Sequence, residues 1–439
     1  MPRSVIKEED SSGVVADQRR TKFLLRLGPG LITGAADDDP SGIATYSQIG
    51  AQFGMGLLWT MLFSFPLMAA IQEICARLGR ITGTGIAANL RMHYPKPVLY
   101  VVVLLLCVAN VFNLGADIIA MGAAAKLVLG GNLNVYAVIF GVLSLCLQIY
   151  IPYRRYVRYL KWLTIVLFAY VTTAFVVHVA WIAAIRATVI PSVSWKTDYW
   201  MALVAVLGTT ISPYLFFWQA SEEAEEVTVT AGESALKKKP FQAFKQFRRI
   251  HIDTLVGMAI SNLIAFFIIL TASVTIHAAG SAGGIQTAAD AAKALQPVAG
   301  RLAFLLFSIG IVGTGLLAVP VLAGSAGYAV AETFRWSASL EKKARQAPKF
   351  YLIIAGATMI GLSLNFIGLN PIRALYWSAI LNGIVATPLM IMMMVISSSR
   401  AVVGDFTLPV YLRIVGWAAT AVMFLASAGF LMTSLFRKL

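Results

Sequence analysis

Long apolar segments alternate with short polar segments along most of this chain. A helix needs roughly 20 consecutive apolar residues to cross the hydrocarbon core of a bilayer. Eleven segments meet this requirement, at residues 29–53, 56–78, 97–127, 134–152, 159–182, 200–222, 252–276, 302–331, 350–368, 373–397 and 409–435. Hydrophobic residues make up 59% of the 439 residues and charged residues 13%, which is more apolar surface than a soluble protein of this length can bury. The pattern predicts an all-α polytopic membrane protein embedded in a lipid bilayer.

The basic residues are concentrated in alternate loops. They cluster before the first apolar segment and after the second, fourth, sixth and eighth, while the other loops contain few of them. This distribution predicts a cytoplasmic N-terminus and, with eleven spans, an extracytoplasmic C-terminus. The net charge of +15 therefore reflects membrane orientation, and no nucleic-acid partner is predicted. Residues 1–21 are polar and lack an apolar core, so they are predicted to form a disordered cytoplasmic tail.

Two of the apolar segments are interrupted by polar residues and a proline, at residues 34–42 and 208–214. Pro40 and Pro213 each remove a backbone donor and disfavour helix at the preceding residue. Matched broken segments indicate a transport site between two inverted repeats. The predicted fold is LeuT-like, with five plus five spans and one extra. It forms a single transmembrane domain, residues 22–439, with a first repeat at 29–182, a second repeat at 200–397 and an eleventh span at 409–435.

The residues at the two breaks are rich in oxygen ligands. Asp39 brings a carboxylate, and unwinding frees the backbone carbonyls of Ala36 and Thr209. Further hydroxyl groups come from Thr209, Thr210, Ser212 and Tyr214. Such hard-oxygen ligands suit magnesium, calcium and manganese better than softer metals. The alternative is that the prolines only kink structural helices, but two kinks at matched positions, one beside three aspartates, favour a cation site.

Several polar residues near the breaks have more than one interpretation. Asp37 and Asp38 could form an acidic vestibule, or could cap a half-helix, with Asp38 supporting the cation site. Asn382 could hydrogen-bond a hydrated ion or could bridge two helices. Asp117 could pair with polar groups inside the bundle. The acidic run that ends the sixth span is interpreted as a solvated surface run, with a cytoplasmic exit funnel as the alternative; it contains Glu222, Glu223, Glu225 and Glu226.

Five sequence segments resemble the Nramp family of proton-coupled transition-metal transporters. They are Gly28-Pro29-Gly30, Asp39-Pro40-Ser41-Gly42, Gly50-Ala51-Gln52-Phe53-Gly54, Leu57-Leu58-Trp59 and Pro371-Ile372-Arg373-Ala374-Leu375. The resemblance covers most of the chain and implies eleven spans and secondary transport. It also implies that the chain is not an enzyme and that its metal is a transported substrate rather than a cofactor.

The chain departs from the family pattern where the metal would bind. The family's first-helix motif is Asp-Pro-Gly-Asn, and its Asn falls on Gly42, while Asp39 keeps the Asp. The family's sixth-helix Met-Pro-His falls on Ser212, Pro213 and Tyr214. Loss of the thioether removes the ligand that favours softer metals, and a wider site suits a partly hydrated ion. This combination resembles the Nramp-related magnesium transporters of bacteria, which implies uptake of Mg²⁺, with Mn²⁺ also carried, across the plasma (inner) membrane.

A second departure concerns proton coupling. The family's third-span Asp and Glu fall on Ala116 and Ile119, and its histidines fall on Tyr214 and Gln219. Asp117 is expected on a different helical face, so the titratable relay is missing. We therefore expect uncoupled transport, for which a potential of 100 mV supplies ~4–5 kcal/mol per divalent cation. The alternatives are a proton-coupled Mn²⁺ or Fe²⁺ transporter, a LeuT-like transporter of an organic substrate, and a channel or non-transporting receptor.

Overall fold

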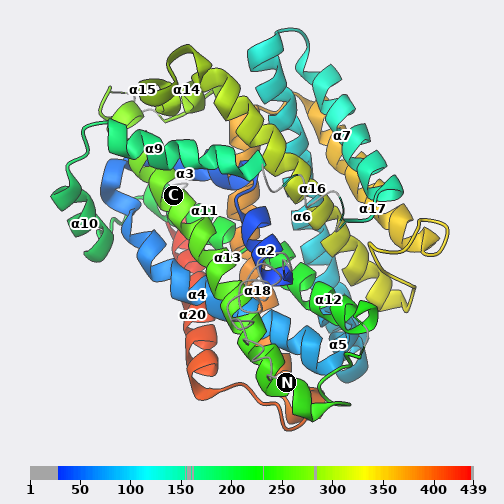
Figure 1. Cartoon of the computed structure of the whole chain (residues 1–439). Coiled ribbons are helices and arrows are strands. Elements are labelled where there is room, and N and C mark those ends of the chain that lie inside the picture. Colours follow the sequence, from blue (N-terminus) through cyan, green and yellow to red (C-terminus); the bar gives the residue numbers. More distant parts are fainter. Residues whose placement is uncertain are drawn as a thin grey trace, which may run out of the picture.

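The structure is a computed structural model that describes residues 28–153, 155, 160, 163–230, 232–280 and 284–436. The predicted N-terminal tail, residues 1–21, lies outside these residues. Every regular element in the described part of the chain is a helix (Figure 1). The all-α prediction is therefore confirmed.

The first half of the chain forms the helices of the predicted first repeat. The long or apolar ones are α2 Pro29–Asp37, α3 Pro40–Phe53, α4 Trp59–Thr82, α6 Lys96–Leu129, α7 Leu133–Tyr150 and α9 Phe168–Val176. Shorter elements connect them, namely η1 Gly54–Leu57, α5 Ile86–His93, η2 Leu163–Leu167 and α10 Trp181–Val189.

The second half repeats this order of a broken helix followed by longer helices. Its main elements are α11 Thr197–Thr210, α12 Pro213–Val229, α13 Ala243–Ala272, α16 Ala303–Phe334, α17 Pro348–Ser363, α18 Pro371–Ser398 and α20 Val410–Phe436. The connecting elements are η3 Pro240–Gln242, η4 Ser273–His277, α14 Ala288–Ala292, η5 Lys293–Leu295, α15 Gln296–Ala299, η6 Gly300–Leu302, η7 Leu364–Ile367 and α19 Arg400–Val403.

Nine helical segments in the described ranges are long and apolar enough to cross a membrane. The first predicted span is divided between α2 and α3, and the fifth is represented by the shorter apolar helix Ile165–Val176. The prediction that this fifth helix continues to residue 182 is wrong, because the backbone is extended at Val177 and α10 begins separately at Trp181. Hydropathy alone does not register such a change of direction. The total of eleven spans remains a prediction.

The two predicted helix breaks are present. α2 ends at Asp37, and Asp39 is extended (φ −71°, ψ 170°) immediately before Pro40 begins α3. α11 ends at Thr210, and Ser212 is extended (φ −81°, ψ 128°) before Pro213 begins α12. In each case the residue that precedes the proline leaves the helical region, as the steric clash with the proline ring requires.

Glycines let the broken helices pack directly on their neighbours. A Cβ atom on Gly34 of α2 would overlap the backbone of Gly257 on α13, and one on Gly208 of α11 would overlap the backbone around Gly383 of α18. Such close backbone approach is typical of helix packing in membranes. It fixes α2 beside α13 and α11 beside α18, and Figure 1 shows α2 and α12 surrounded by the longer helices.

Candidate metal site

The two helix breaks meet in the interior of the bundle. The hydroxyl of Tyr214, in the first turn of α12, donates a hydrogen bond to the carbonyl of Ala36 at 3.0 Å and approaches Oδ2 of Asp39 at 3.4 Å. On the other side, a Cβ atom on Gly42 would lie 3.1 Å from Cγ2 of Thr209. Five of the residues expected at the site therefore surround one small region.

Asp39 presents a buried carboxylate to this region. Its Oδ1 accepts a hydrogen bond from the backbone N–H of Gly42 at 2.6 Å, which caps the N-terminus of α3. Its Oδ2 accepts one from Nδ2 of Asn113 on α6 at 3.2 Å. The residue is 3% exposed, and no basic side chain in the described residues pairs with it. A buried carboxylate without a cationic partner is expensive in a membrane interior, so this arrangement suits a bound cation.

Hydroxyl groups cover the backbone carbonyls near the second break. Oγ of Ser212 donates to the carbonyl of Thr209 at 2.7 Å and is 2.9 Å from that of Gly208. The Thr209 and Ala36 carbonyls thus each accept a hydrogen bond from a side-chain hydroxyl that a bound ion could displace by rotation. Thr210 is the last residue of α11, and its hydroxyl donates to the carbonyl of Val206 on its own helix at 3.1 Å.

Asn382 lies on α18, one helical turn from a serine that contacts the first break. Ser378, four residues before Asn382, has its hydroxyl 2.9 Å from that of Ser41. Residues four apart lie on one helical face, so Asn382 faces the same side of the bundle. It is 2% exposed, and its Oδ1 has no hydrogen-bond partner among the described residues. This geometry leaves both interpretations of Asn382 open.

Asn113 was not expected at the site, and Asp117 lies closer to it than the sequence indicates. Both lie on α6 and are four residues apart, which puts them on one helical face. Asp117 is fully buried, and its carboxylate interacts with the backbone N–H of Ser41 in α3 and electrostatically with Asp39. This agrees with the expectation that Asp117 pairs with polar groups inside the bundle, here with Ser41 at the first break. Its carboxylate lies near the site because α6 presents the same face at both positions.

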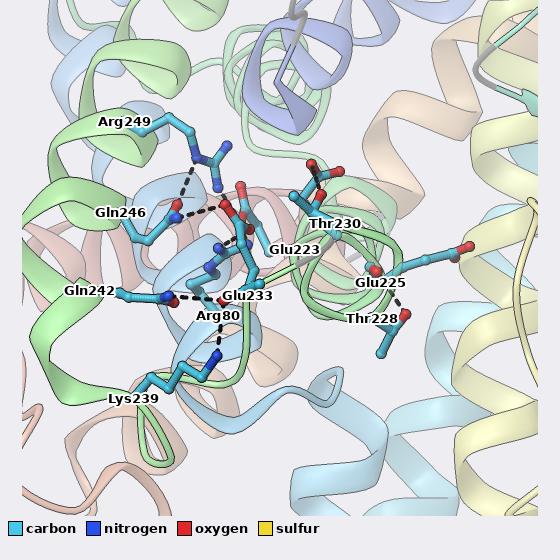
Figure 2. A network of polar contacts seen from close by, with 12 residues as sticks. Arg80, Glu223, Glu225, Thr228, Thr230, Glu233, Lys239, Gln242, Gln246 and Arg249 are labelled. Atoms are coloured by element: carbon cyan, nitrogen blue, oxygen red, sulfur yellow. Dashed lines mark hydrogen bonds and ion pairs between the residues drawn. The ribbon is translucent and has the colours of Figure 1, made fainter.

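The acidic run at the end of α12 is not a solvated surface. Glu223 is fully buried, and Glu222 and Glu225 are 7% and 9% exposed. Oε2 of Glu223 accepts from Arg249 on α13 at 2.5 Å and lies 3.9 Å from Arg80 on α4. Figure 2 shows these charged groups converging from separate helices. The interpretation as a surface run is wrong because other helices cover this end of α12 and supply partners for its carboxylates.

The same charged network reaches the N-terminus of α2. Oδ2 of Asp253 accepts a hydrogen bond from the backbone N–H of Gly30 at 2.9 Å and lies 4.0 Å from Arg249. One turn further along α2, Thr33 donates to Gln219 on α12. The first half-helix is thus held to α12 and α13 by polar contacts as well as by glycine packing.

Comparison with known proteins identifies the family of the chain. The chain matches the family described as natural resistance-associated macrophage protein-like over residues 30–433. A divalent metal cation transporter MntH of Klebsiella pneumoniae (strain 342) is 27% identical over 436 residues, which cover 94% of this chain and 95% of that protein. The same transporter from a second K. pneumoniae strain is equally similar.

Solved structures resemble this one in fold. The crystal structure of a manganese transporter of Eremococcus coleocola, in complex with an aromatic bis-isothiourea substituted compound, has a TM-score of 0.75 at 16% identity, covering 97% of this chain and 88% of that one. Mhp1, a nucleobase-cation-symport-1 family transporter, has a TM-score of 0.56 at 14% identity, covering 93% of each chain. These likenesses confirm the predicted LeuT-like fold. The chain belongs to the natural resistance-associated macrophage protein-like (Nramp) family.

Proposed function

We propose that this protein imports divalent metal cations across the bacterial plasma membrane by alternating access, with Mg²⁺ as the main substrate and Mn²⁺ as the second. Members of the Nramp family are secondary metal transporters and not enzymes. The observation that carries the proposal is the Asp39 carboxylate, which is buried at the first helix break beside Tyr214 of the second broken helix and has no basic partner among the described residues. The metal is a transported substrate, and no resident cofactor is proposed.

The preference for magnesium rests on the chemistry of the ligands. Asp39, Ala36, Thr209 and Ser212 offer only oxygen atoms, which suit hard cations. In the described residues, no group of three or more His, Cys, Asp or Glu side chains is arranged to hold a metal ion. A site with few direct charged ligands suits Mg²⁺, which retains several waters.

A growth assay tests this substrate assignment. A bacterial strain without its own magnesium uptake systems should grow at limiting Mg²⁺ when it expresses this protein. The Asp39→Asn variant, expressed to the same level in the membrane, should not support growth. If the wild-type protein instead rescues only a strain deficient in manganese uptake, the magnesium assignment is wrong.

We further propose that transport is uncoupled from protons. A relay needs several titratable groups in succession. His93 contacts the carbonyl of Asn89 on its own helix, His251 contacts Glu73 on α4, and His277 contacts the carbonyl of Ala51 near the end of α3. None of these partners lies at either break. Asp117 is the one observation that favours the proton-coupled alternative, because its buried carboxylate interacts with Asp39. Among the described carboxylates, Asp117 interacts electrostatically with Asp39, which is the residue proposed to bind the metal.

Asn113 is expected to orient the metal-binding carboxylate. Its amide fixes Oδ2 of Asp39, and loss of a residue that orients a ligand typically weakens metal binding about 10–100-fold. We predict that Asn113→Ala raises the KM for Mg²⁺ uptake by about tenfold. Asn110→Ala is a matched control, because Asn110 lies on the same helix and donates to the carbonyl of Leu322 instead. Equal KM values in the wild type and Asn113→Ala would show that Asn113 does not orient the Asp39 carboxylate for metal binding.

The charged network at the end of α2 is proposed to keep the cytoplasmic side closed. Arg249 joins Glu223 of α12 to Asp253, which holds Gly30 of α2. Breaking a buried ion pair is strongly destabilising, because it leaves a buried charge unpaired. We predict that Arg249→Ala shifts the population toward a state open on this side.

Cysteine accessibility measures this shift. In a background that lacks Cys75, Cys107 and Cys146, a Thr33→Cys substitution puts a thiol on the buried face of α2. Its modification should become about tenfold faster with Arg249→Ala, which corresponds to ~1.4 kcal/mol in the opening equilibrium. Arg248→Ala serves as the control, because the neighbouring Arg248 is exposed. An unchanged rate would show that the network does not hold this end closed.

A further inference from the structure

We propose that the first helix break contains a second binding site for a divalent cation, formed by Asp37, Asp38, Ser261 and Tyr46. The site lies beside Asp39 and is separate from it. The inference rests on the proposed transport function, because it assigns a second ion-binding site to the same transport pathway.

The first observation is the way in which two carboxylates share one hydroxyl. Oγ of Ser261, on α13, lies 2.6 Å from Oδ2 of Asp37 and 3.2 Å from Oδ1 of Asp38. A serine hydroxyl carries one hydrogen, so it can donate fully to only one of these oxygens. The three residues are between 1% and 3% exposed. Three oxygen atoms therefore converge in a buried position where a positive charge is needed.

The second observation is a buried, unpartnered phenol within electrostatic range of the same carboxylates. Tyr46, on α3, is fully buried, and its hydroxyl has no hydrogen-bond partner among the described residues. Its electrostatic interactions are with Asp37 first, then Asp38 and Asp39. Oδ1 of Asp37 also lacks a partner in this part of the chain. The phenol oxygen and the free carboxylate oxygen complete a set of hard-oxygen ligands of the kind that Mg²⁺ and Mn²⁺ take.

The two sites use different sides of the break. The oxygens of Asp39 accept hydrogen bonds from Gly42 of α3 and from Asn113 of α6. Those of Asp37 and Asp38 instead lie next to Ser261 of α13.

The charge at the break matches two divalent cations. Asp37, Asp38, Asp39 and Asp117 are buried, and no described Lys, Arg or His pairs with any of them. Four carboxylates carry a formal charge of −4, which two divalent cations neutralise. Uncompensated carboxylates at this depth would be costly. A cation in the second site would also repel the ion at Asp39, which favours its release, as between adjacent sites in an ion pathway.

Equilibrium binding of Mn²⁺ to the purified full-length protein tests the proposal. We expect two Mn²⁺ per chain, with electron paramagnetic resonance spectra broadened by the coupling of two neighbouring ions. Asp38→Asn and Ser261→Ala should each retain one Mn²⁺ and lose the broadening. Ser273→Ala, on the element that directly follows α13, should retain two. Tyr46→Phe, which keeps the ring, should weaken the second binding step about fivefold.

The outcomes separate this inference from the transport function. One Mn²⁺ in the wild type, lost in Asp39→Asn and retained in Asp38→Asn, would overturn the second site and leave the proposed function standing. No bound Mn²⁺ in the wild type would overturn both. The wild-type stoichiometry decides the matter even if a variant fails to fold.

Discussion

Replacing Asp39 by asparagine is expected to reduce metal uptake into proteoliposomes at least a hundredfold. The substitution removes the charge that compensates a divalent cation but leaves a side-chain oxygen. That oxygen can still accept the hydrogen bond from the Gly42 N–H, which lies 2.6 Å from Oδ1 of Asp39 in the wild-type protein. Asparagine is as good an N-cap as aspartate, so α3 should keep its start. Loss of one buried charge partner is worth about 3–5 kcal/mol, which exceeds the ~2.8 kcal/mol of a hundredfold effect.

Two comparisons separate charge from capping. Asp39→Ala removes both, and it should lose transport equally while also lowering thermal stability by about 1 kcal/mol, the usual cost of a lost N-cap. Asp290→Asn is a control outside the site, since Asp290 completes the capping box of α14 and pairs with Lys293. If Asp39→Asn retained near wild-type uptake while correctly folded, the carboxylate would not be the metal ligand.

Restoring the family's side chains at the breaks should shift selectivity toward manganese. The double variant Gly42→Asn with Ser212→Met adds an amide and a thioether to the site. Sulfur favours softer metals over magnesium, and Ser212→Met also removes the hydroxyl that donates to the Thr209 carbonyl. We expect the ratio of Mn²⁺ to Mg²⁺ uptake to rise by at least tenfold in competition assays, with most of the change in Mg²⁺ flux.

A side chain at Gly42 would come into close contact with Thr209. A Cβ atom there would lie 3.1 Å from Cγ2 of Thr209 and 3.4 Å from Oδ1 of Asp39, so Thr209 must move by a few tenths of an ångström. Thr209→Ser in the same background removes that methyl group. Ser212→Ala is the matched control, because it removes the hydroxyl without adding sulfur. If the double variant is fully expressed and its Mn²⁺/Mg²⁺ selectivity is unchanged, ligand chemistry at the breaks does not set the metal preference.

Local sequence signals were sufficient to predict the fold and the position of the breaks. Pro40 and Pro213 act on the residue directly before them, so both breaks appear where the sequence predicts. Apolar runs likewise predict most of the long helices to within a few residues. The fifth span is the exception, because the turn at Val177 does not interrupt hydropathy.

Residues that complete the site come from distant parts of the chain. Asn113 is 74 residues from Asp39, and Ser261 is 224 residues from Asp37. Neither belongs to a motif, and only tertiary packing brings them together. The buried state of Glu223 was missed for a related reason: a run of four glutamates is typical of a solvated helix end, and its partners Arg80 and Arg249 lie on other helices. Burial of charge depends on neighbours that sequence spacing does not reveal.

Asp117 illustrates the limit of alignment by motif. Aligning the third span by its glycine places the family's acids on Ala116 and Ile119, and Asp117 is expected on a different helical face from these two. In the structure Asp117 shares a face with Asn113 and senses the charge of Asp39. Whether transport is coupled to protons therefore depends on whether Asp117 takes part in proton transfer.

The most direct test is Mg²⁺ uptake by the wild-type protein in proteoliposomes, with internal pH and internal Mg²⁺ recorded together under an imposed negative-inside potential. We expect the logarithm of the internal-to-external Mg²⁺ ratio to rise in proportion to the potential and internal pH to stay constant, with Asp117→Asn behaving in the same way. Internal acidification on addition of Mn²⁺, without Mg²⁺ influx, would contradict this expectation.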